Sequence, residues 1–212
     1  MSKKMSKSAL AMVLSRLEGF LSPKVSQEQY LTDSEIAAFS LWNAYILGDL
    51  EGKVITDFGC GTGVLGIGAL LLGAKHVLFV DSDRSALETL KINISKVKSE
   101  SYTIEGSFEI FNQDIGEVNL EADVVIENPP FGTKTKHADV IFLEKALKTA
   151  KVIYSFHKSE TKAHINKVCT EKGAKITHVW DFDFPLKSTY KFHNKRIHRI
   201  KVSCFRIESD KR

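Results

Sequence analysis

From Lys53 onward, short runs rich in β-branched residues alternate with longer segments of helical periodicity. Parallel strands are joined by crossover helices, so this alternation predicts an α/β protein with a mostly parallel sheet. No helical pattern separates the last two runs, which we expect to pair as an antiparallel hairpin. The seven predicted strands are Val54–Phe58, Val77–Asp81, Phe108–Asn112, Asp123–Glu127, Val152–Phe156, Ile176–Asp183 and Ile200–Ile207.

Helical patterns connect these strands and also precede them. Apolar residues spaced at i, i+3, i+4 and i+7 predict an amphipathic helix within residues 8–21, and Thr32-Asp33-Ser34-Glu35 matches a capping box that opens a second helix. A chain of 212 residues suits one domain, 1–212, with a helical extension (1–50) and a doubly wound, Rossmann-like sheet (51–212). The predicted crossover helices are Val64–Leu72, Asp83–Lys96, Asp139–Ala150 and Lys158–Lys172.

Composition excludes several classes of protein. Hydrophobic residues make up 43% and charged residues 26%, which argues against a disordered chain or a coiled coil. The longest largely apolar run, Val64–Ala74, falls short of the ~18 to 20 residues of a membrane-spanning helix. The widely spaced Cys60, Cys169 and Cys204 predict a reduced intracellular protein without a metal site. We expect a cytoplasmic protein, also nuclear if its source is a eukaryote.

Positive charge is concentrated at the two ends of the chain. Residues 25–185 carry 16 basic and 23 acidic side chains, whereas the remaining residues carry 14 basic and 3 acidic ones. The stretch from Lys187 to Lys201 mixes lysines and arginines with aromatic and histidine side chains and contains no acid. Such a mixture is typical of surfaces that bind RNA phosphates and unpaired bases. A solvated hairpin whose lysines protect an edge strand explains it about equally well.

A glycine-rich turn, Asp57-Phe58-Gly59-Cys60-Gly61-Thr62-Gly63, follows the first predicted strand and opens the first crossover helix. Glycines let the backbone approach a ligand, and the helix N-terminus offers N–H groups to a carboxylate or phosphate. The Asp57 carboxylate could receive an ammonium group, whereas in a dinucleotide site it would face an anionic pyrophosphate. Dinucleotide binding stays open as an alternative, because Gly61-x-Gly63-x-x-Gly66 matches that motif.

Two further acids follow neighbouring strands. Asp81 ends the second predicted strand and could hold ribose hydroxyls, and Asp114, after the third, could accept a hydrogen bond from an adenine amino group. Together with Asp57 they outline S-adenosylmethionine. Helix capping is the alternative for such acids, and it is most plausible for Asp83.

The fourth predicted strand runs into Asn128-Pro129-Pro130-Phe131. Two prolines stiffen this turn and donate no N–H, so it presents acceptors in a rigid frame. Asn128 Oδ1 and the Pro129 carbonyl could accept both hydrogens of an aromatic amino group and aim its nitrogen at a sulfonium methyl, while Phe131 stacks on the base. The alternative is a turn that ends the strand and carries a core phenylalanine.

These motifs together resemble class I amino-nitrogen methyltransferases, and most closely the methyltransferase-like protein 5 family, which makes N6-methyladenosine in small-subunit ribosomal RNA. Besides the glycine turn, the resemblance extends over several segments: Leu14–Leu17, Gly19-Phe20, Pro23-Lys24, Glu28–Thr32, Asn128–Thr133, Tyr154–Lys158 and Tyr190–His193. It implies a methyltransferase domain that uses S-adenosylmethionine, and a small zinc-binding activator subunit paired with an exposed sheet edge, for which Phe108–Phe111 is the candidate. This sequence departs from the family at Thr56 and Phe58 and in its basic segment after Asn194.

The expected site has three parts, with no metal. The catalytic residues are Asn128, Pro129, Pro130 and Phe131. The cofactor-binding residues are Gln29, Tyr30 and Thr32, which the resemblance adds, with Asp57, Gly59, Cys60, Gly61, Gly63, Asp81, Ser82, Asp114, Ile115 and Asn128. The RNA-binding residues are Lys134, Lys136, His157, Lys158, Tyr190, Lys191, His193, Lys195 and Arg196. Alternative functions are methylation of guanine N2 or a glutamine side chain, and RNA binding by a chain with a vestigial cofactor site.

Overall fold

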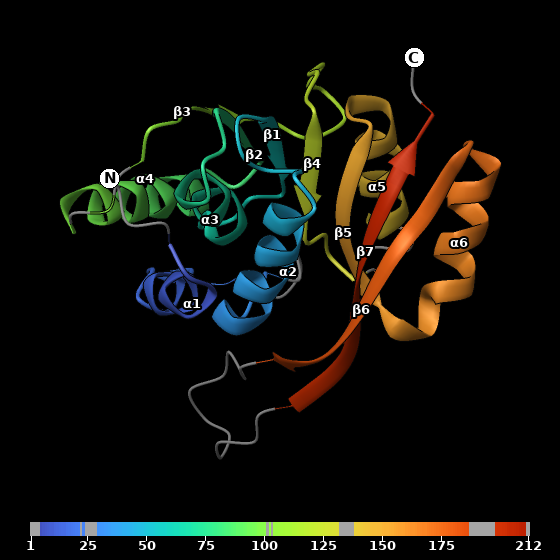
Figure 1. Ribbon diagram of the computed structural model, residues 1–212, viewed down its shortest axis with the longest axis horizontal. Helices are drawn as coiled ribbons and strands as arrows, with labels where there is room; N and C mark the ends of the chain where they lie inside the picture. Colours follow the sequence, from blue (N-terminus) through green and yellow to red (C-terminus); the bar gives the residue numbers. More distant parts are fainter. Residues whose placement is uncertain are drawn as a thin grey trace.

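Residues 5–21, 23, 29–100, 102, 104–131, 138–186 and 198–210 are described by the computed structural model. Among them, seven strands form one sheet in the order β3-β2-β1-β4-β5-β7-β6 (Figure 1). The first five in this order are parallel, and β7 is antiparallel to both β5 and β6. The strands are β1 (Val54–Phe58), β2 (His76–Asp81), β3 (Ser107–Asn112), β4 (Val124–Glu127), β5 (Val152–Lys158), β6 (Ala174–Leu186) and β7 (His198–Ser209). The predicted seven-stranded sheet with a C-terminal hairpin is confirmed.

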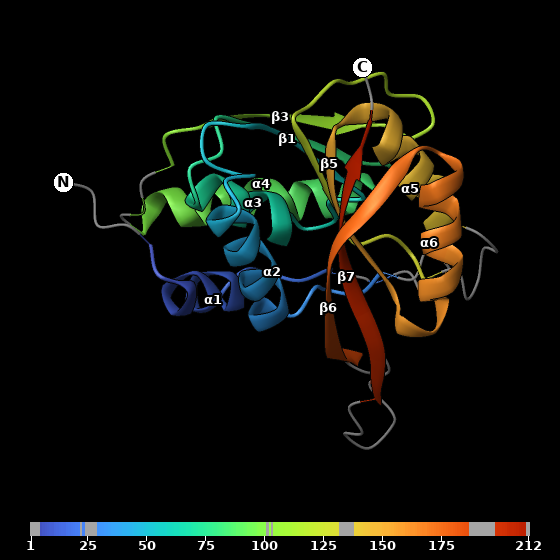
Figure 2. The ribbon, with the colours of Figure 1, turned by 45° about the vertical axis from the view of Figure 1, so that its right-hand side comes forward.

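Helices cover both faces of this sheet (Figures 1 and 2). Side chains alternate along each strand, so β1 sends Ile55 into the core beneath α1 to α4 and Phe58 into the core beneath α5 and α6. Cover on both faces explains why the central strands β1, β2 and β4 are largely apolar and buried. The helices are α1 (Lys7–Ser15), α2 (Ser34–Ile46), α3 (Val64–Leu71), α4 (Arg84–Ser99), α5 (Ala138–Thr149) and α6 (Lys162–Glu171), with a 3₁₀ turn η2 (Ser159–Thr161).

Several helix boundaries differ from prediction; α4, for example, continues to Ser99 rather than ending at Lys96. α1 ends at Ser15, and residues 16–20 continue as an irregular strap. The sixth helix begins at Lys162, after the 3₁₀ turn. Asp33, rather than Thr32, caps α2, because its carboxylate accepts hydrogen bonds from Glu35 N and Ile36 N. The Thr32 hydroxyl is thereby available for a different contact.

The carboxyl ends of the parallel strands form one edge, where ligands bind in sheets of this type. The β6–β7 hairpin extends past this edge, since Lys158, which ends β5, is paired with Val202 while β7 begins at His198 (Figures 1 and 2). Leu186, which ends β6, and His198, which begins β7, therefore lie beyond the edge that carries the site. Within the described ranges, no helix combines the length and apolar character needed to cross a membrane.

Candidate active site

The glycine turn after β1 depends on residues without a Cβ. Gly61 and Gly63 have φ of 53° and 91°, which favour glycine. A Cβ on Gly63 would lie 2.2 Å from Leu90 Cδ1, and one on Gly61 would lie 2.8 Å from Phe20 Cζ. The turn is therefore packed against α4 on one side and against the strap on the other.

Two acids hold this turn to the strands that precede and neighbour it. Asp57 Oδ2 accepts a hydrogen bond from Gly66 N at 2.8 Å, and Asp81 Oδ2 accepts one from Gly61 N at 2.8 Å. Burial, together with the nearby charge of Asp81, raises the pKa of Asp57 to about 8. A cationic group beside Asp57 would stabilise its ionised form. The site thus favours a ligand with an ammonium group at this point.

A cavity with about 320 Å³ of empty space, part of it open to solvent, joins the glycine turn to Asn128. Seven of the predicted site residues line it. They come from the segment before α2, from the end of β1 with the glycine turn, and from the turn after β4. Phe20, Leu31, Thr62, Val64 and Leu65 complete its wall and were not predicted. The predicted residues that line it are Tyr30, Thr32, Asp57, Gly59, Cys60, Gly61 and Asn128.

Asn128 lies at the end of β4 with its amide held in one orientation. Its Nδ2 donates a hydrogen bond to Thr32 Oγ1 over 3.0 Å. Its Oδ1 is buried and has no hydrogen-bond partner among the described residues. A buried acceptor without a donor costs free energy, so Oδ1 is poised to accept a hydrogen from a ligand. The acceptor role that the sequence predicts for Asn128 stays a prediction.

Phe131 is enclosed by two other rings. Tyr30 is stacked on it with a centroid distance of 5.8 Å and an interplanar angle of 18°, and Phe184 of β6 packs edge-on at 6.0 Å. Phe131 is only 6% exposed. One face of Phe131, on which a substrate base was predicted to stack, is thus covered by Tyr30 in this structure.

The predicted nucleoside-binding residues lie beyond the cavity, at the ends of β2 and β3. Asp81 Oδ1 accepts a hydrogen bond from Asp83 N, and Asp83 Oδ2 accepts one from Gln29 Nε2 at 2.7 Å. Asp83 also caps α4, as expected.

Asp114, which follows β3, is exposed and accepts a hydrogen bond from Gly116 N within its own turn, beside the buried Ile115. Ser82 is also exposed, and its carbonyl accepts a bond from Asn112 Nδ2.

Most of the predicted RNA-binding residues lie outside the described residues: Lys134, Lys136, Tyr190, Lys191, His193, Lys195 and Arg196. Lys158 is described at the end of β5, where its ammonium group lies 3.7 Å from Glu160. His157 was predicted to face RNA, and here the structure corrects the prediction. Its ring is fully buried between the sheet and α5, and both ring nitrogens have partners.

His157 belongs to a buried polar chain on the side of the sheet opposite Asn128. Ser155 Oγ donates to Glu127 Oε1 at 2.7 Å and lies 2.8 Å from His157 Nε2, and His157 Nδ1 lies 3.3 Å from Asp139 Oδ2. Burial, with the charges of Asp139 and Asp57, raises the pKa of Glu127 to about 8. Burial also lowers the pKa of His157. This chain does not line the cavity.

The sheet order, the glycine turn after β1 and the acid at the end of β2 define a class I, Rossmann-like methyltransferase. The family model described as "Conserved hypothetical protein 95" matches residues 34–178. The Danio rerio protein "rRNA N(6)-adenosine-methyltransferase METTL5" is 33% identical over 92% of this chain and 94% of its own. An uncharacterized protein from Methanocaldococcus jannaschii is 40% identical over 95% and 94%, respectively. The chain therefore belongs to the METTL5 family of methyltransferases.

Structure comparison agrees with this assignment. A crystal structure from Pyrococcus horikoshii, described as that of "a putative RNA methyltransferase", superposes with a TM-score of 0.86 at 43% identity and covers 99% of both chains. The resemblance, the fold class and the assignment as a methyltransferase that the sequence predicted are confirmed at the level of the family.

Proposed function

We propose that this protein methylates the N6 amino group of an adenosine in small-subunit ribosomal RNA, with S-adenosylmethionine as the methyl donor. The observation that carries the proposal is the buried Asn128 Oδ1, which lacks a donor among the described residues and lies on one cavity wall with Asp57. An amino group entering this cavity would supply the missing donor. The METTL5 relative from Danio rerio, named for adenosine N6 methylation of rRNA, supports the same reaction.

The residues present fit S-adenosylmethionine. Asp57 would receive its ammonium group, the glycine turn and the N-terminus of α3 its carboxylate, and Asp81 its ribose. Gln29, held on Asp83, would cover the ribose from the N-terminal side. When bound, the cofactor supplies an electrophilic methyl group whose bond to sulfur breaks as the bond to nitrogen forms.

The chain's own contribution is to orient the acceptor nitrogen. The lone pair of an adenine amino group is delocalised into the ring, so the nitrogen is a weak nucleophile. Accepting its hydrogens at Asn128 Oδ1 and at the Pro129 carbonyl favours a pyramidal nitrogen with an exposed lone pair. After transfer the nitrogen carries a surplus proton, which water can take. Glu127 is not the base, because it faces the opposite side of the sheet.

The basic segment 187–197 would bind the RNA backbone, together with Lys134 and Lys136, which follow the Asn-Pro-Pro-Phe turn in the sequence. The target adenine must be unpaired or flipped to enter the cavity, which costs a few kcal/mol in a duplex. The favoured substrate is therefore a single-stranded or distorted region of ribosomal RNA. We propose that the protein meets this RNA in the cytoplasm.

We also propose that a small zinc-binding activator pairs with β3. This strand is an edge of the described sheet, since it pairs with β2 alone. Phe108 and Ile110 are half-buried there, and an added strand would cover them. Co-expression with such a subunit should yield a one-to-one complex in size-exclusion chromatography, and separate elution of the two chains would contradict the pairing.

The deciding experiment is methyl transfer to ribosomal RNA from labelled S-adenosylmethionine, followed by nucleoside analysis. Labelled N6-methyladenosine is expected; N2-methylguanosine or methylglutamine would place the reaction on another nitrogen. RNA binding without label would indicate a vestigial cofactor site. Asn128→Ala should lose transfer by orders of magnitude, whereas Asn166→Ala, at an exposed position on α6, should retain it.

A further inference from the structure

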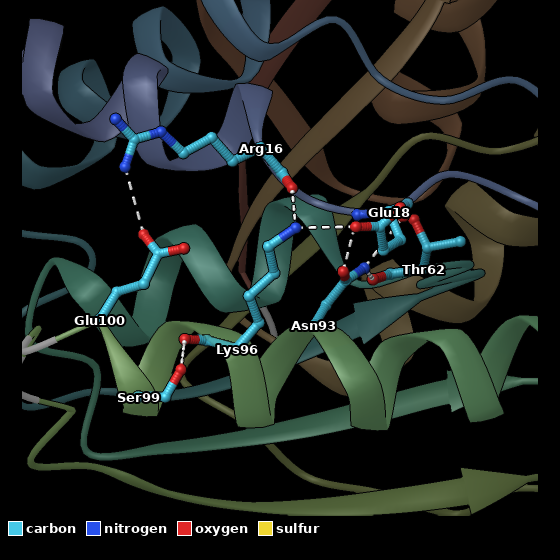
Figure 3. Close-up of polar contacts among 7 residues, drawn as sticks. All are labelled: Arg16, Glu18, Thr62, Asn93, Lys96, Ser99 and Glu100. Carbon is cyan, nitrogen blue, oxygen red and sulfur yellow. Dashed lines mark hydrogen bonds and ion pairs between the residues drawn. The ribbon is translucent and has the colours of Figure 1, made fainter.

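The strap formed by residues 16–20 lies along α4 and is tied to it by several polar contacts (Figure 3). Lys96 Nζ donates to the carbonyl of Arg16 at 2.8 Å and to Glu18 Oε1 at 2.7 Å. The Arg16 guanidinium lies 3.3 Å from Glu100. These contacts are exposed, so each contributes little to stability.

Asn93, one turn earlier on α4, makes a different set of contacts. It is fully buried, its Oδ1 accepts a hydrogen bond from Glu18 N at 2.7 Å, and its Nδ2 donates to the Glu18 carbonyl at 3.0 Å and to the Thr62 carbonyl at 2.9 Å (Figure 3). One amide thus joins the main chain of two segments, 75 and 31 residues away in the sequence. A carboxylate or hydroxyl of similar size cannot supply one acceptor and two donors together.

Both segments continue directly into the cavity wall. Thr62 lies between Gly61 and Gly63 in the glycine turn, and Phe20, two residues after Glu18, packs against Gly61. Phe20, Gly61 and Thr62 all line the cavity, but Asn93 does not. Asn93 lies outside the cavity and joins two parts of its wall, the strap with Phe20 and the glycine turn.

We propose that Asn93 is a positioning residue for the cofactor, which acts by fixing the strap with Phe20 against the glycine turn. This inference rests on the proposed use of S-adenosylmethionine. A cavity whose two walls are joined by buried hydrogen bonds is organised before the ligand arrives, so binding does not have to order it. Without the amide, the cofactor would have to order both segments when it binds, and its affinity would fall.

The test compares Asn93→Leu, which keeps the branched shape of the side chain and loses every side-chain hydrogen bond, with Lys96→Met as the matched control. Lys96 holds the same strap from the next turn of α4, and its hydrogen bonds go to Arg16 and Glu18 rather than to the glycine turn. Isothermal titration with S-adenosylhomocysteine should give at least a tenfold weaker Kd for Asn93→Leu and a Kd within twofold of wild type for Lys96→Met. In transfer assays, Asn93→Leu should raise KM for S-adenosylmethionine at least tenfold while kcat stays within threefold, because Asn93 does not touch the acceptor nitrogen.

A loss of stability alone would not produce this pattern, because Kd and KM are measured at a temperature where both variants are folded. Should Asn93→Leu not fold, Asn93→Asp retains the acceptor for Glu18 N and loses both donors, and the same weakening is expected. Wild-type cofactor affinity in whichever variant folds overturns the inference. If the wild-type protein itself does not bind S-adenosylhomocysteine, the proposed function fails instead.

Discussion

Asn128 Nδ2 donates a hydrogen bond to the hydroxyl of Thr32, 96 residues earlier in the sequence, over 3.0 Å. Thr32 is 8% exposed and directly precedes Asp33, which caps α2. A residue just before a helix outside the β-α-β core thereby contacts the amide of the proposed catalytic residue. With Nδ2 engaged, the acceptor Oδ1 is the atom left for the substrate.

Thr32→Val should lower kcat roughly tenfold, a loss of ~1.4 kcal/mol of transition-state stabilisation, because the amide can then rotate. Thr32→Ser retains the hydroxyl and serves as the control with near wild-type turnover. Single-turnover methyl transfer at saturating S-adenosylmethionine measures this step. Equal rates for the valine and serine variants would show that Thr32 does not orient Asn128.

Phe131→Leu should reduce methyl transfer by at least tenfold and leave the affinity for S-adenosylhomocysteine within threefold. Leucine retains most of the packing against Phe184 but removes the flat surface on which a base stacks. Phe184→Leu is the matched control, since this ring belongs to the same cluster but lies on β6, outside the Asn-Pro-Pro-Phe turn. If both variants lose activity equally, Phe131 contributes packing and not base stacking.

The strand and helix pattern was predictable because it depends on local periodicity, whereas several site contacts were not. The capping-box pattern placed the start of α2 correctly, but assigned the capping oxygen to Thr32. Asp33 caps the helix instead, and the Thr32 hydroxyl accepts a hydrogen bond from Asn128, which follows a distant strand. No local signal in the sequence distinguishes these two oxygens.

Phe20 and His157 show the same limit. The periodicity predicted a helix within residues 8–21, a range that includes Phe20, but α1 ends at Ser15. No local pattern in the sequence places the Phe20 ring on Gly61. His157 stands at the end of the predicted fifth strand, beside polar residues. The sequence does not reveal that β7 pairs with this part of β5 and that α5 contacts the His157 ring, so that the ring is buried. The glycine turn and the Asn-Pro-Pro-Phe turn could be recognised in the sequence, because the residues of each are adjacent in the chain and follow a single strand.

Replacing Lys191, Lys195 and Arg196 by alanine should weaken RNA binding and flatten its dependence on salt concentration. Each phosphate that is no longer neutralised by a basic side chain reduces the slope of log K against log salt by about 0.7 to 0.9. Fluorescence anisotropy with a labelled single-stranded RNA at several potassium chloride concentrations gives this slope. Replacement of three lysines outside this segment controls for net charge; they are exposed on α5, α6 and β6: Lys148, Lys167 and Lys175. An unchanged slope in the first variant would identify segment 187–197 as a solvated hairpin.

Glu127→Gln should make stability less sensitive to alkaline pH. Burial raises the pKa of Glu127 from an ordinary value of 4.5 to about 8, so the folded protein retains a proton that the unfolded chain has lost. The stability associated with this group is fully present below about pH 4.5 and declines as pH rises towards 8. Glutamine carries no titrating proton and can still accept the hydrogen bond from Ser155.

Urea unfolding at pH 5, 7 and 9 should therefore show the free energy of unfolding falling less steeply for Glu127→Gln, by a few kcal/mol across the range, since each pKa unit corresponds to about 1.4 kcal/mol. Asp57 has a pKa raised in the same direction and contributes a similar decline in both proteins. Glu121→Gln, at an exposed position before β4, should follow the wild-type profile. Because Glu127 faces α5 rather than the cavity, the cofactor affinity of Glu127→Gln should be unchanged. If the free energy of unfolding depends on pH in the same way for wild type and Glu127→Gln, the Glu127 carboxyl group is ionised in the folded protein and the prediction is wrong.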